Sequence, residues 1–376
     1  MFINLADYAV DPITGFLPSP DPLRQLPAPF ADWDEVGADL PALLLAGTAR
    51  VRLAALPHAD VAQLQDGLQL ERAMLLLSTF ANAYVWGEPE PAQRIPSALA
   101  VPLWQITERL GRKPIISHAS NALHNWRRLD SCAGITLDNL GILQPFLGSS
   151  DEAWFVLVTV AVEACGAAAL QHLVRAQTAV MQNDIATLGD ALSHIASVIG
   201  RMSATLNRMY EKCDPHIFFT RIRPFLASWP APGVVYEGVS ETPVVFAGGS
   251  AGQSSLVQAL DAALSVRHTD PRSSPFLLEM RGYMPPPHRK FVEVLEAGPD
   301  MRAFVQTHTP SQPALAEAYN ACIGLLTNFR KQHMEIAVRY ITKQMPDNEE
   351  AKGTGGTSLA QFLGATRQET RERHIQ

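Results

Sequence analysis

Long stretches in which apolar residues recur every three or four positions dominate the chain after residue 150. This spacing gathers apolar side chains on one face of an α-helix, whereas the apolar/polar alternation typical of strands is scarce. We expect helices over residues 151–180, 182–212, 215–228, 253–266, 285–297 and 313–344. Only GVVYEGV (233–239) and PVVF (243–246) look briefly extended, so the pattern predicts an all-α protein.

The first part of the chain has a different composition. Residues 11–30, DPITGFLPSPDPLRQLPAPF, contain too many prolines for a regular helix, and we expect an irregular strap on the surface. Helical patterns begin near residue 38 and recur in 40–56, 61–86 and 97–111. A length of 376 residues suggests two domains. We expect a small N-terminal domain over 1–146 and a larger helical bundle over 147–376.

Charge and cysteine usage exclude several classes of partner. The chain carries 30 basic and 37 acidic residues, a net charge of −7, with no long basic run, so we expect neither nucleic acid nor an anionic membrane as a partner. The apolar segment 153–170 has Glu163 in its middle, which favours a buried core helix over a membrane span. Four scattered cysteines and no signal peptide predict reduced thiols in a cytoplasmic protein.

His333 interrupts an apolar helical stripe. The stripe comprises Leu315, Tyr319, Cys322, Leu326, Phe329, Ile336 and Tyr340. A histidine in such a place is more often a hydrogen-bonded core residue than a ligand. Arg330 lies one turn earlier on the same side, however. An imidazole and a guanidinium projecting together suit a planar cofactor with a metal centre and acidic edge groups, such as haem.

GGSAGQSS, residues 248–255, opens the helix expected over 253–266. Free amides at a helix N-terminus can receive a phosphate or a carboxylate, but the segment lacks the lysine of a phosphate-binding loop. A tight turn followed by a helix cap explains it equally well. Asp261 follows on that helix and is a candidate counter-charge for a buried arginine.

Two further segments offer groups for a flat ligand. IFFTRIRPFLASW (217–229) places Phe218 and Arg223 close together, as an aromatic wall and a cation or as parts of an ordinary core helix. Phe155 and Thr159 share one helix face, and such a threonine usually bonds the carbonyl four residues earlier. Near the C-terminus, GTGGT (353–357) precedes an amphipathic helix over 358–372, so the loop is held at both ends and can close over a site.

Other enzyme classes lack their motifs in this sequence. There is no GxSxG elbow, no HExxH and no GxGxxG before a helix. His118 and His124 are six residues apart, which does not bring two metal ligands together on a helix. Hydrolases, zinc metalloproteases and dinucleotide-dependent oxidoreductases are therefore disfavoured.

Five segments together resemble the indoleamine 2,3-dioxygenase family, whose members are haem enzymes that open the indole ring of tryptophan. The segments are FRKQH, GGSAGQSS, FFTRIRPFL, YNACIGLLTNFR and KGTGGT, and the similarity covers about residues 110–370. The resemblance implies that His333 is the proximal ligand of the haem iron. It also implies that Arg330, paired with Asp261, holds a haem propionate.

The resemblance further implies a substrate pocket to which the N-terminal domain contributes. Phe155 and Phe218 would pack on the indole, Arg223 would bind the carboxylate, and Thr354 would close over the amino-acid end. Thr159 would be a pocket residue without a catalytic role. The segment beside the haem edge would comprise Gly249, Ser250 and Ala251.

The implied reaction inserts both atoms of O2 across the indole C2=C3 bond of L-tryptophan or a related indoleamine. The product is N-formylkynurenine, in the first step of the kynurenine pathway. Haem b and O2 would carry the chemistry without a catalytic side chain, in a monomeric protein. His118 and Asn121 stand where better-known members have tyrosine and cysteine, so a modified indole in a biosynthetic pathway stays open as substrate. A haem sensor or carrier without turnover is the other alternative.

Overall fold

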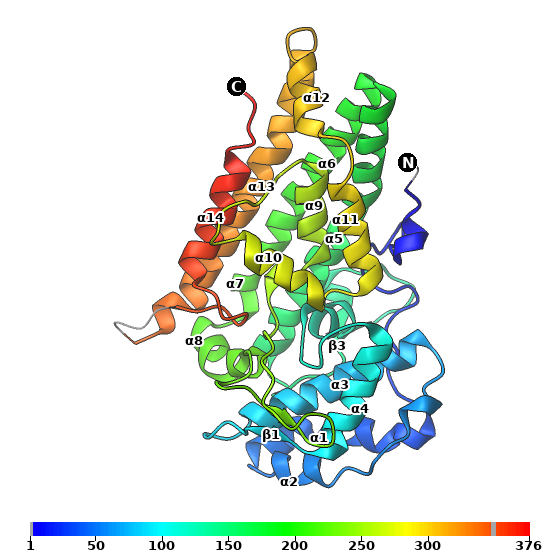
Figure 1. Cartoon of the computed structure of the whole chain (residues 1–376), viewed down its shortest axis with the longest axis vertical. Helices are drawn as coiled ribbons and strands as arrows, with labels where there is room; N and C mark the ends of the chain where they lie inside the picture. Colours follow the sequence, from blue (N-terminus) through cyan, green and yellow to red (C-terminus); the bar gives the residue numbers. More distant parts are fainter. Residues whose placement is uncertain (1–2, 347–350) are drawn as a thin grey trace.

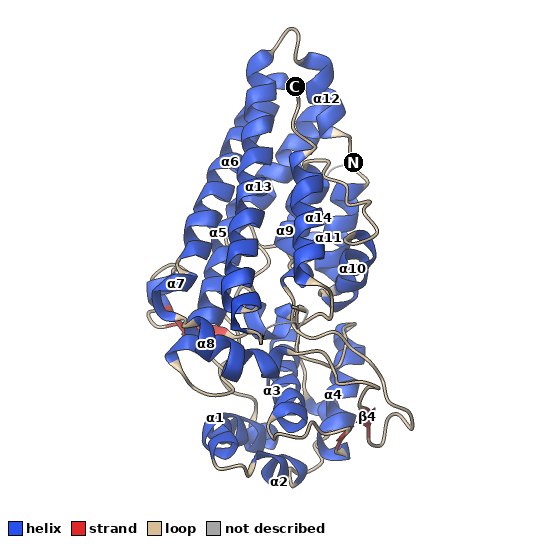
Figure 2. Cartoon of the chain, turned by 90° about the vertical axis from the view of Figure 1, so that its left-hand side faces the viewer, coloured by secondary structure: helices blue, strands red, loops and turns tan. Residues whose placement is uncertain are grey.

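The computed structural model of the chain describes residues 3–346 and 351–376. It confirms the all-α prediction (Figures 1 and 2). The N-terminal helices are α1 (Ala31–Leu45), α2 (Ala49–Ala54), α3 (Gly67–Trp86) and α4 (Ser97–Leu110). The later ones are α5 (Ser150–Gln182), α6 (Ile185–Asn207), α7 (Met209–Lys212), α8 (Pro215–Ile217), α9 (Ser255–Ala263), α10 (Ser274–Met280), α11 (Pro286–Glu296), α12 (Met301–His308), α13 (Pro313–Tyr340) and α14 (Leu359–Arg371).

The long helices α5, α6 and α13 lie side by side and form the body of the molecule (Figure 2). Helix α14 packs along α13, and α9 packs between α5 and α11. Helices α1 to α4 gather at the lower end of Figure 1. Helix α5 is long and apolar enough to span a membrane, since a stretch of 18 residues in it has a mean hydropathy of 1.9, but 67% of that stretch is buried inside the protein. It is built like the core helix of a soluble protein.

The short strands pair across distant parts of the chain. β1 (Arg94–Ile95) runs parallel to β4 (Val235–Tyr236), and β2 (Trp126–Arg128) runs antiparallel to β3 (Leu140–Ile142). Val234 also bridges to Val244, so both segments expected to be extended take part in strand pairing. The pairing of β1 with β4 ties the N-terminal helices to the loop that precedes the 248–255 segment.

Several helix boundaries differ from the prediction. The segment 215–228 is not one α-helix, and Pro224, which has no N–H to bond the carbonyl four residues earlier, lies in its last turn. It forms α8, a π-helical turn (Phe218–Ile222) and a 3-10 turn (Arg223–Leu226). Helix α1 begins at Ala31 rather than near residue 38, and α10 and α12 were not expected.

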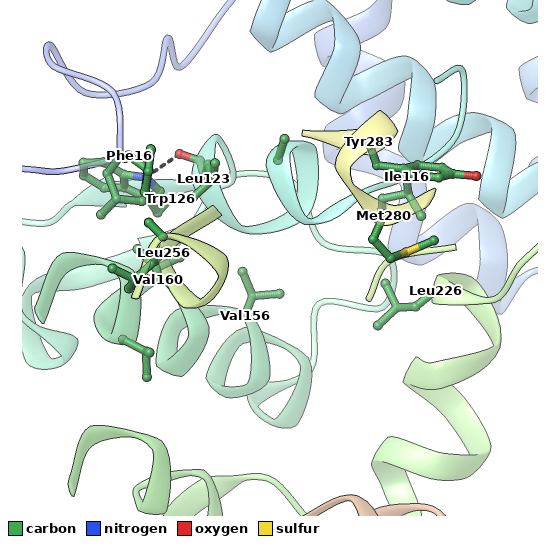
Figure 3. Packing of buried hydrophobic residues seen from close by; sticks show 14 of the residues in the cluster. Phe16, Ile116, Leu123, Trp126, Val156, Val160, Leu226, Leu256, Met280 and Tyr283 are labelled. Carbon is green, nitrogen blue, oxygen red and sulfur yellow. Dashed lines mark hydrogen bonds between the residues drawn. The ribbon is translucent and has the colours of Figure 1, made fainter. Parts of the chain in front are cut away.

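The proline-rich strap is irregular, as predicted, but it does not merely lie on the surface. Phe16 is buried, and its ring centroid lies 4.7 Å from that of His288 and 5.8 Å from that of Phe291 on α11. Figure 3 shows Phe16 among the buried residues, and the indole N–H of Trp126, also drawn there, donates to the carbonyl of Leu123 at 2.9 Å. The strap therefore covers the junction between the N-terminal part and the helical bundle.

Candidate functional site

A largely apolar cavity lies between α5, α9, α13, α14 and the segments around residues 118 and 250. The volume of this cavity is about 230 Å³. A second cavity of about 160 Å³ shares part of its wall. Ten of the sequence-predicted site residues line the first cavity: His118, Asn121, Phe155, Thr159, Gly249, Ser250, Ala251, Asp261, Arg330 and His333. The fold thus brings together residues from four separate regions of the sequence.

His333 lies on α13 and faces both cavities. Its ring makes no hydrogen bond to any residue within 3–346 or 351–376, which distinguishes it from a core histidine with a fixed partner. Burial, together with the nearby Arg330 cation, lowers the pKa of His333 to about 4. The imidazole is therefore neutral at physiological pH and has a nitrogen lone pair available for a metal ion.

Arg330 and Asp261 form a buried ion pair beside His333. Nη2 of Arg330 donates to Oδ2 of Asp261 at 2.6 Å. Burial opposes ionisation of Asp261, but the charges of Arg330 and His268 outweigh it and lower the pKa of this carboxyl. Nη1 of Arg330 is buried and has no hydrogen-bond partner among the described residues, and the same holds for Oδ1 of Asp261.

These residues fit haem. A neutral imidazole suits its iron, and an unpartnered buried guanidinium N–H one helical turn away suits an acidic edge group. Leaving such a donor buried without a partner costs about 1–3 kcal/mol, which an anionic ligand would remove. No group of three or more histidine, cysteine or carboxylate side chains that could hold a metal by themselves occurs in the described part of the chain.

Three polar side chains that are hydrogen-bonded to one another line part of the otherwise apolar cavity. Nε2 of His118 lies 2.9 Å from Oε1 of Glu163, and Ser254 donates its hydroxyl to the same oxygen at 2.7 Å. Glu163 lines the cavity but was not among the predicted site residues. Its signal in the sequence was an ionisable residue inside a very apolar helix, four positions after Thr159. Thr159 donates to the carbonyl of Phe155 at 3.1 Å, as expected.

The 248–255 segment is a tight turn followed by helix caps. The side chain of Ser250 accepts from the amide of Gly252, and Gln253 bonds back to the amide of Ser250, forming a capping box. A Cβ on Gly248 would lie 2.1 Å from the carbonyl oxygen of Leu226, so only glycine fits there. Ser254 then caps α9. The turn explains the glycine and serine content, and it also holds residues 249–251 against the cavity.

Phe218 and Thr354 line the second cavity. The ring centroids of Phe218 and Phe155 lie 4.6 Å apart, with an interplanar angle of 41°, so the two rings form one aromatic wall. The backbone carbonyl of Thr354 accepts from the amide and the hydroxyl of Ser228, at 3.1 and 2.6 Å. The Thr354 hydroxyl donates to the carbonyl of Gly249. The loop of residues 353–357, here called the glycine loop, is therefore docked on the turn that borders both cavities.

Arg223 lines neither cavity. Its guanidinium lies over the ring of Phe219, 5.5 Å from the centroid, and Nη2 donates to the carbonyl of Lys352 at the start of the glycine loop. Nε is buried and has no partner among the described residues, and burial lowers the pKa of the side chain. Arg223 thus contacts the loop that borders the second cavity, and its role toward a substrate carboxylate stays a prediction.

Comparisons with known proteins agree on one family. Residues 4–373 match the family model described as indoleamine 2,3-dioxygenase. The chain is 36% identical over 388 residues to indoleamine 2,3-dioxygenase 1 of Mus musculus, covering 97% of this chain and 94% of that protein. It is 34% identical over 423 residues to indoleamine 2,3-dioxygenase of Saccharomyces cerevisiae, covering 97% and 92%. A protein of Haliotis madaka named myoglobin is 31% identical over 382 residues, covering 98% of each chain.

Proposed function

Because the chain belongs to the indoleamine 2,3-dioxygenase family, we propose that it is a haem-dependent dioxygenase acting on L-tryptophan or a related indoleamine. The proposed product is N-formylkynurenine or its analogue, in the first step of the kynurenine pathway. The observation that carries the proposal is a neutral His333 beside an arginine with a free buried N–H, both without a partner there among the described residues and both in one apolar cavity.

In this proposal His333 holds the iron of haem b, and Arg330, kept in place by Asp261, pairs with a propionate. Haem supplies the centre at which O2 is bound and activated. The apolar walls exclude water from the site, and Phe155 and Phe218 orient the flat indole. Arg223 supplies a fixed cation for the substrate carboxylate, and Thr354 keeps the loop closed over the amino-acid end.

Haem binding can be tested by a substitution at His333. His333→Ala is expected to abolish the Soret absorption of the purified protein, because it removes the proposed iron ligand. His194→Ala, on the exposed side of α6, is the matched control and is expected to keep it. A His333→Ala protein that retained haem and full turnover would overturn the proposal.

The substrate can be tested with the reduced holoprotein in the presence of O2. L-Tryptophan is expected to perturb the Soret band and then to yield N-formylkynurenine. The same assay would also test two further substrate classes, indoleamines without a carboxylate and ring-substituted tryptophans. His118, Asn121 and the buried Glu163 give one part of the cavity hydrogen-bonding groups, which supports a modified indole as substrate.

A second candidate function is a haem-binding carrier or sensor without turnover. The relative named myoglobin favours it, since that protein matches the full length of this chain. The aromatic wall and the docked glycine loop favour an enzyme, because a carrier does not need a pocket for an amino acid. Reversible O2 binding without product formation would establish the carrier.

We also propose that the protein acts as a cytoplasmic monomer. The four cysteines are free, as expected of a reducing compartment. Light scattering of the holoprotein would test the oligomeric state, and a dimer would contradict the proposal.

A further inference from the structure

His268 lies between two carboxylates just after α9. Its Nε2 is 3.2 Å from Oδ2 of Asp261, and its Nδ1 is 2.8 Å from Oε2 of Glu369 on α14. A carboxylate oxygen accepts hydrogen bonds, so both ring nitrogens must donate, which requires the imidazolium form. All three side chains are about one-tenth exposed, so water does not replace these contacts.

Glu369 is fixed by three further donors. Its carboxylate accepts from the amides of Thr269 and Asp270, at 2.6 and 2.8 Å, and from the hydroxyl of Ser273 at 2.8 Å. Glu369 therefore cannot follow a displaced His268 without losing several charge-assisted hydrogen bonds. Because α14 directly follows the glycine loop, the position of Glu369 also sets where that loop ends.

The four charged groups form a continuous series across three helices and one loop. Arg330 on α13 pairs with Asp261 on α9, Asp261 contacts His268, and His268 contacts Glu369 on α14. The series is neutral while His268 is protonated. A cofactor carboxylate at the free Nη1 of Arg330 would add one negative charge, and loss of the His268 proton would then leave two unbalanced negative charges in a buried site.

We propose that His268 is a positioning residue which, as an imidazolium between Asp261 and Glu369, links retention of the cofactor at Arg330 to the docking of α14 and its glycine loop. This inference rests on the proposed haem-binding function and deepens it. Retention of the cofactor then depends on the protonation of His268, which acts through Asp261 and Arg330.

The charges around His268 support a dependence on pH near neutrality. Burial and the Arg330 cation lower its pKa, but Asp261 and Glu369 outweigh them, and the net effect is a raised pKa. The other charged side chains near it are already paired: Arg272 with Asp270, Arg267 with the carbonyl of Glu296, and Arg373 with the carbonyl of Arg267. The stabilising positive charge of His268 is therefore fully present below pH 6.5, the ordinary pKa of histidine. It is lost as the pH rises through the higher pKa that His268 has in the folded protein.

The test measures haem release to an excess of a haem-scavenging apoglobin between about pH 6 and pH 9. His333 is neutral throughout this range. The wild-type release rate is expected to rise with pH, by about tenfold for each unit by which bound haem raises the pKa of His268. His268→Gln, which cannot carry the charge, is expected to release haem rapidly and with little dependence on pH. His268→Lys, which keeps the charge, is expected to release it slowly even at the alkaline end.

A second measurement needs no haem. Trypsin cleavage after Lys352, an exposed residue at the start of the glycine loop, is expected to be faster in haem-free His268→Gln than in wild type. His194→Gln is the matched control for both measurements, because its partner Asp190 lies outside this series.

The outcomes separate this inference from the proposed function. A wild-type protein that takes up no haem overturns the function and this inference together. Haem binding with the same pH profile of release in wild type and His268→Gln overturns the inference alone. If His268→Gln does not fold, the decision falls to His268→Lys, and a profile equal to that of wild type overturns the inference.

Discussion

Arg330 illustrates how the surroundings of one residue can indicate a ligand-binding site. Its guanidinium is buried and uses one nitrogen on Asp261, while Nη1 has no partner among the described residues. A buried ion pair is costly to break, because the remaining charge stays away from water. The pair therefore belongs to the folded scaffold as well as to the proposed haem site.

The first prediction concerns this pair. Arg330→Met, which keeps the length of the side chain, is expected to lower the free energy of unfolding of the haem-free protein by about 3–5 kcal/mol, since Asp261 loses its main counter-charge. Urea denaturation would measure it. Lys331→Met is the matched control, because Lys331 and Glu335 form a half-exposed pair on the same helix, and no measurable loss is expected. Equal losses in the free energy of unfolding of both variants would show that the buried Arg330–Asp261 pair contributes no more to stability than an exposed pair.

The second prediction concerns Arg223. Arg223→Ala is expected to raise the KM for tryptophan by roughly 30- to 700-fold, equivalent to about 2–4 kcal/mol, because a buried carboxylate would lose its cation. The haem spectrum is expected to stay unchanged. Arg221→Ala, at an exposed position two residues earlier, serves as the control. An unaltered KM in Arg223→Ala would show that Arg223 does not bind the substrate carboxylate and only contacts the glycine loop.

At the scale of elements, the glycine loop is held against the 248–255 turn by close packing as well as by hydrogen bonds. A Cβ on Gly355 would lie 2.8 Å from Cζ of Phe276 on α10, well inside contact distance. The loop can therefore approach the turn this closely only with glycine at this position. Helix α10, which the sequence pattern did not predict, supplies the surface on which the loop rests.

The third prediction follows from that contact. Gly355→Ala is expected to destabilise the docked loop by about 1–3 kcal/mol, which raises the KM for tryptophan and leaves haem content unchanged. Steady-state kinetics and the Soret absorbance would measure the two effects. Gly364→Ala on α14 is the control, since a Cβ there meets no atom within 4 Å, and it is expected to be neutral or slightly stabilising. A Gly355→Ala enzyme with wild-type KM would mean that docking of the loop does not limit binding.

Across the whole molecule, one hydrophobic core runs through the N-terminal helices and the bundle. We propose that the boundary between the two parts lies between residues 146 and 147, although the parts are closely joined. Asn82 on α3 donates to the carbonyl of Phe225 at 2.9 Å, and the hydroxyl of Tyr236 donates to the carbonyl of Pro114 at 2.5 Å. The N-terminal part contributes His118 and Asn121 to the cavity, so neither part is expected to form the site alone.

A buried polar cluster lies at the same junction. The cluster comprises Glu71 on α3, Arg112 just after α4, His124, and His288 on α11. Nε2 of His288 donates to the carbonyl of Ala9 at 3.2 Å. Nδ1 of His288 is buried and unpartnered among the described residues. Burial, and next the nearby His124, lower the pKa of His288 to about 3.

The fourth prediction is a loss of stability in mild acid. His288 is neutral in the folded protein, whereas its ordinary pKa is 6.5, so its contribution to stability is present above 6.5 and is lost as pH falls toward 3. At about pH 5 the loss amounts to about 2 kcal/mol. His288→Gln keeps a donor for Ala9 but cannot titrate, so its urea stability is expected to fall less than that of wild type. His216→Gln, at an exposed position on α8, is expected to follow wild type, and parallel curves for all three proteins would exclude the effect.

The sequence by itself determined the long helices and the apolar face on which His333 and Arg330 lie. Helix periodicity and capping involve residues within a turn of each other, so they can be read locally. The stripe from Leu315 to Tyr340 is buried as expected, and His333 faces the cavity. The resemblance to one family added further residues that line that cavity, among them His118 and Asn121. The segment 215–228 shows the limit of periodicity, because it forms three short helical turns of different type instead of the one helix expected.

Only the tertiary structure decided which groups meet across the chain. His118 contacts Glu163 over 45 residues, and His268 contacts Glu369 over 101 residues, with no shared periodicity to predict either contact. The same holds for Arg223, which the sequence places beside an aromatic wall and the fold places against the glycine loop. Such contacts depend on how helices pack and where loops return, and packing is set by the shapes of all the buried side chains together. The sequence therefore named His333 and Arg330, which line the cavity, and the fold identified the charges that surround them.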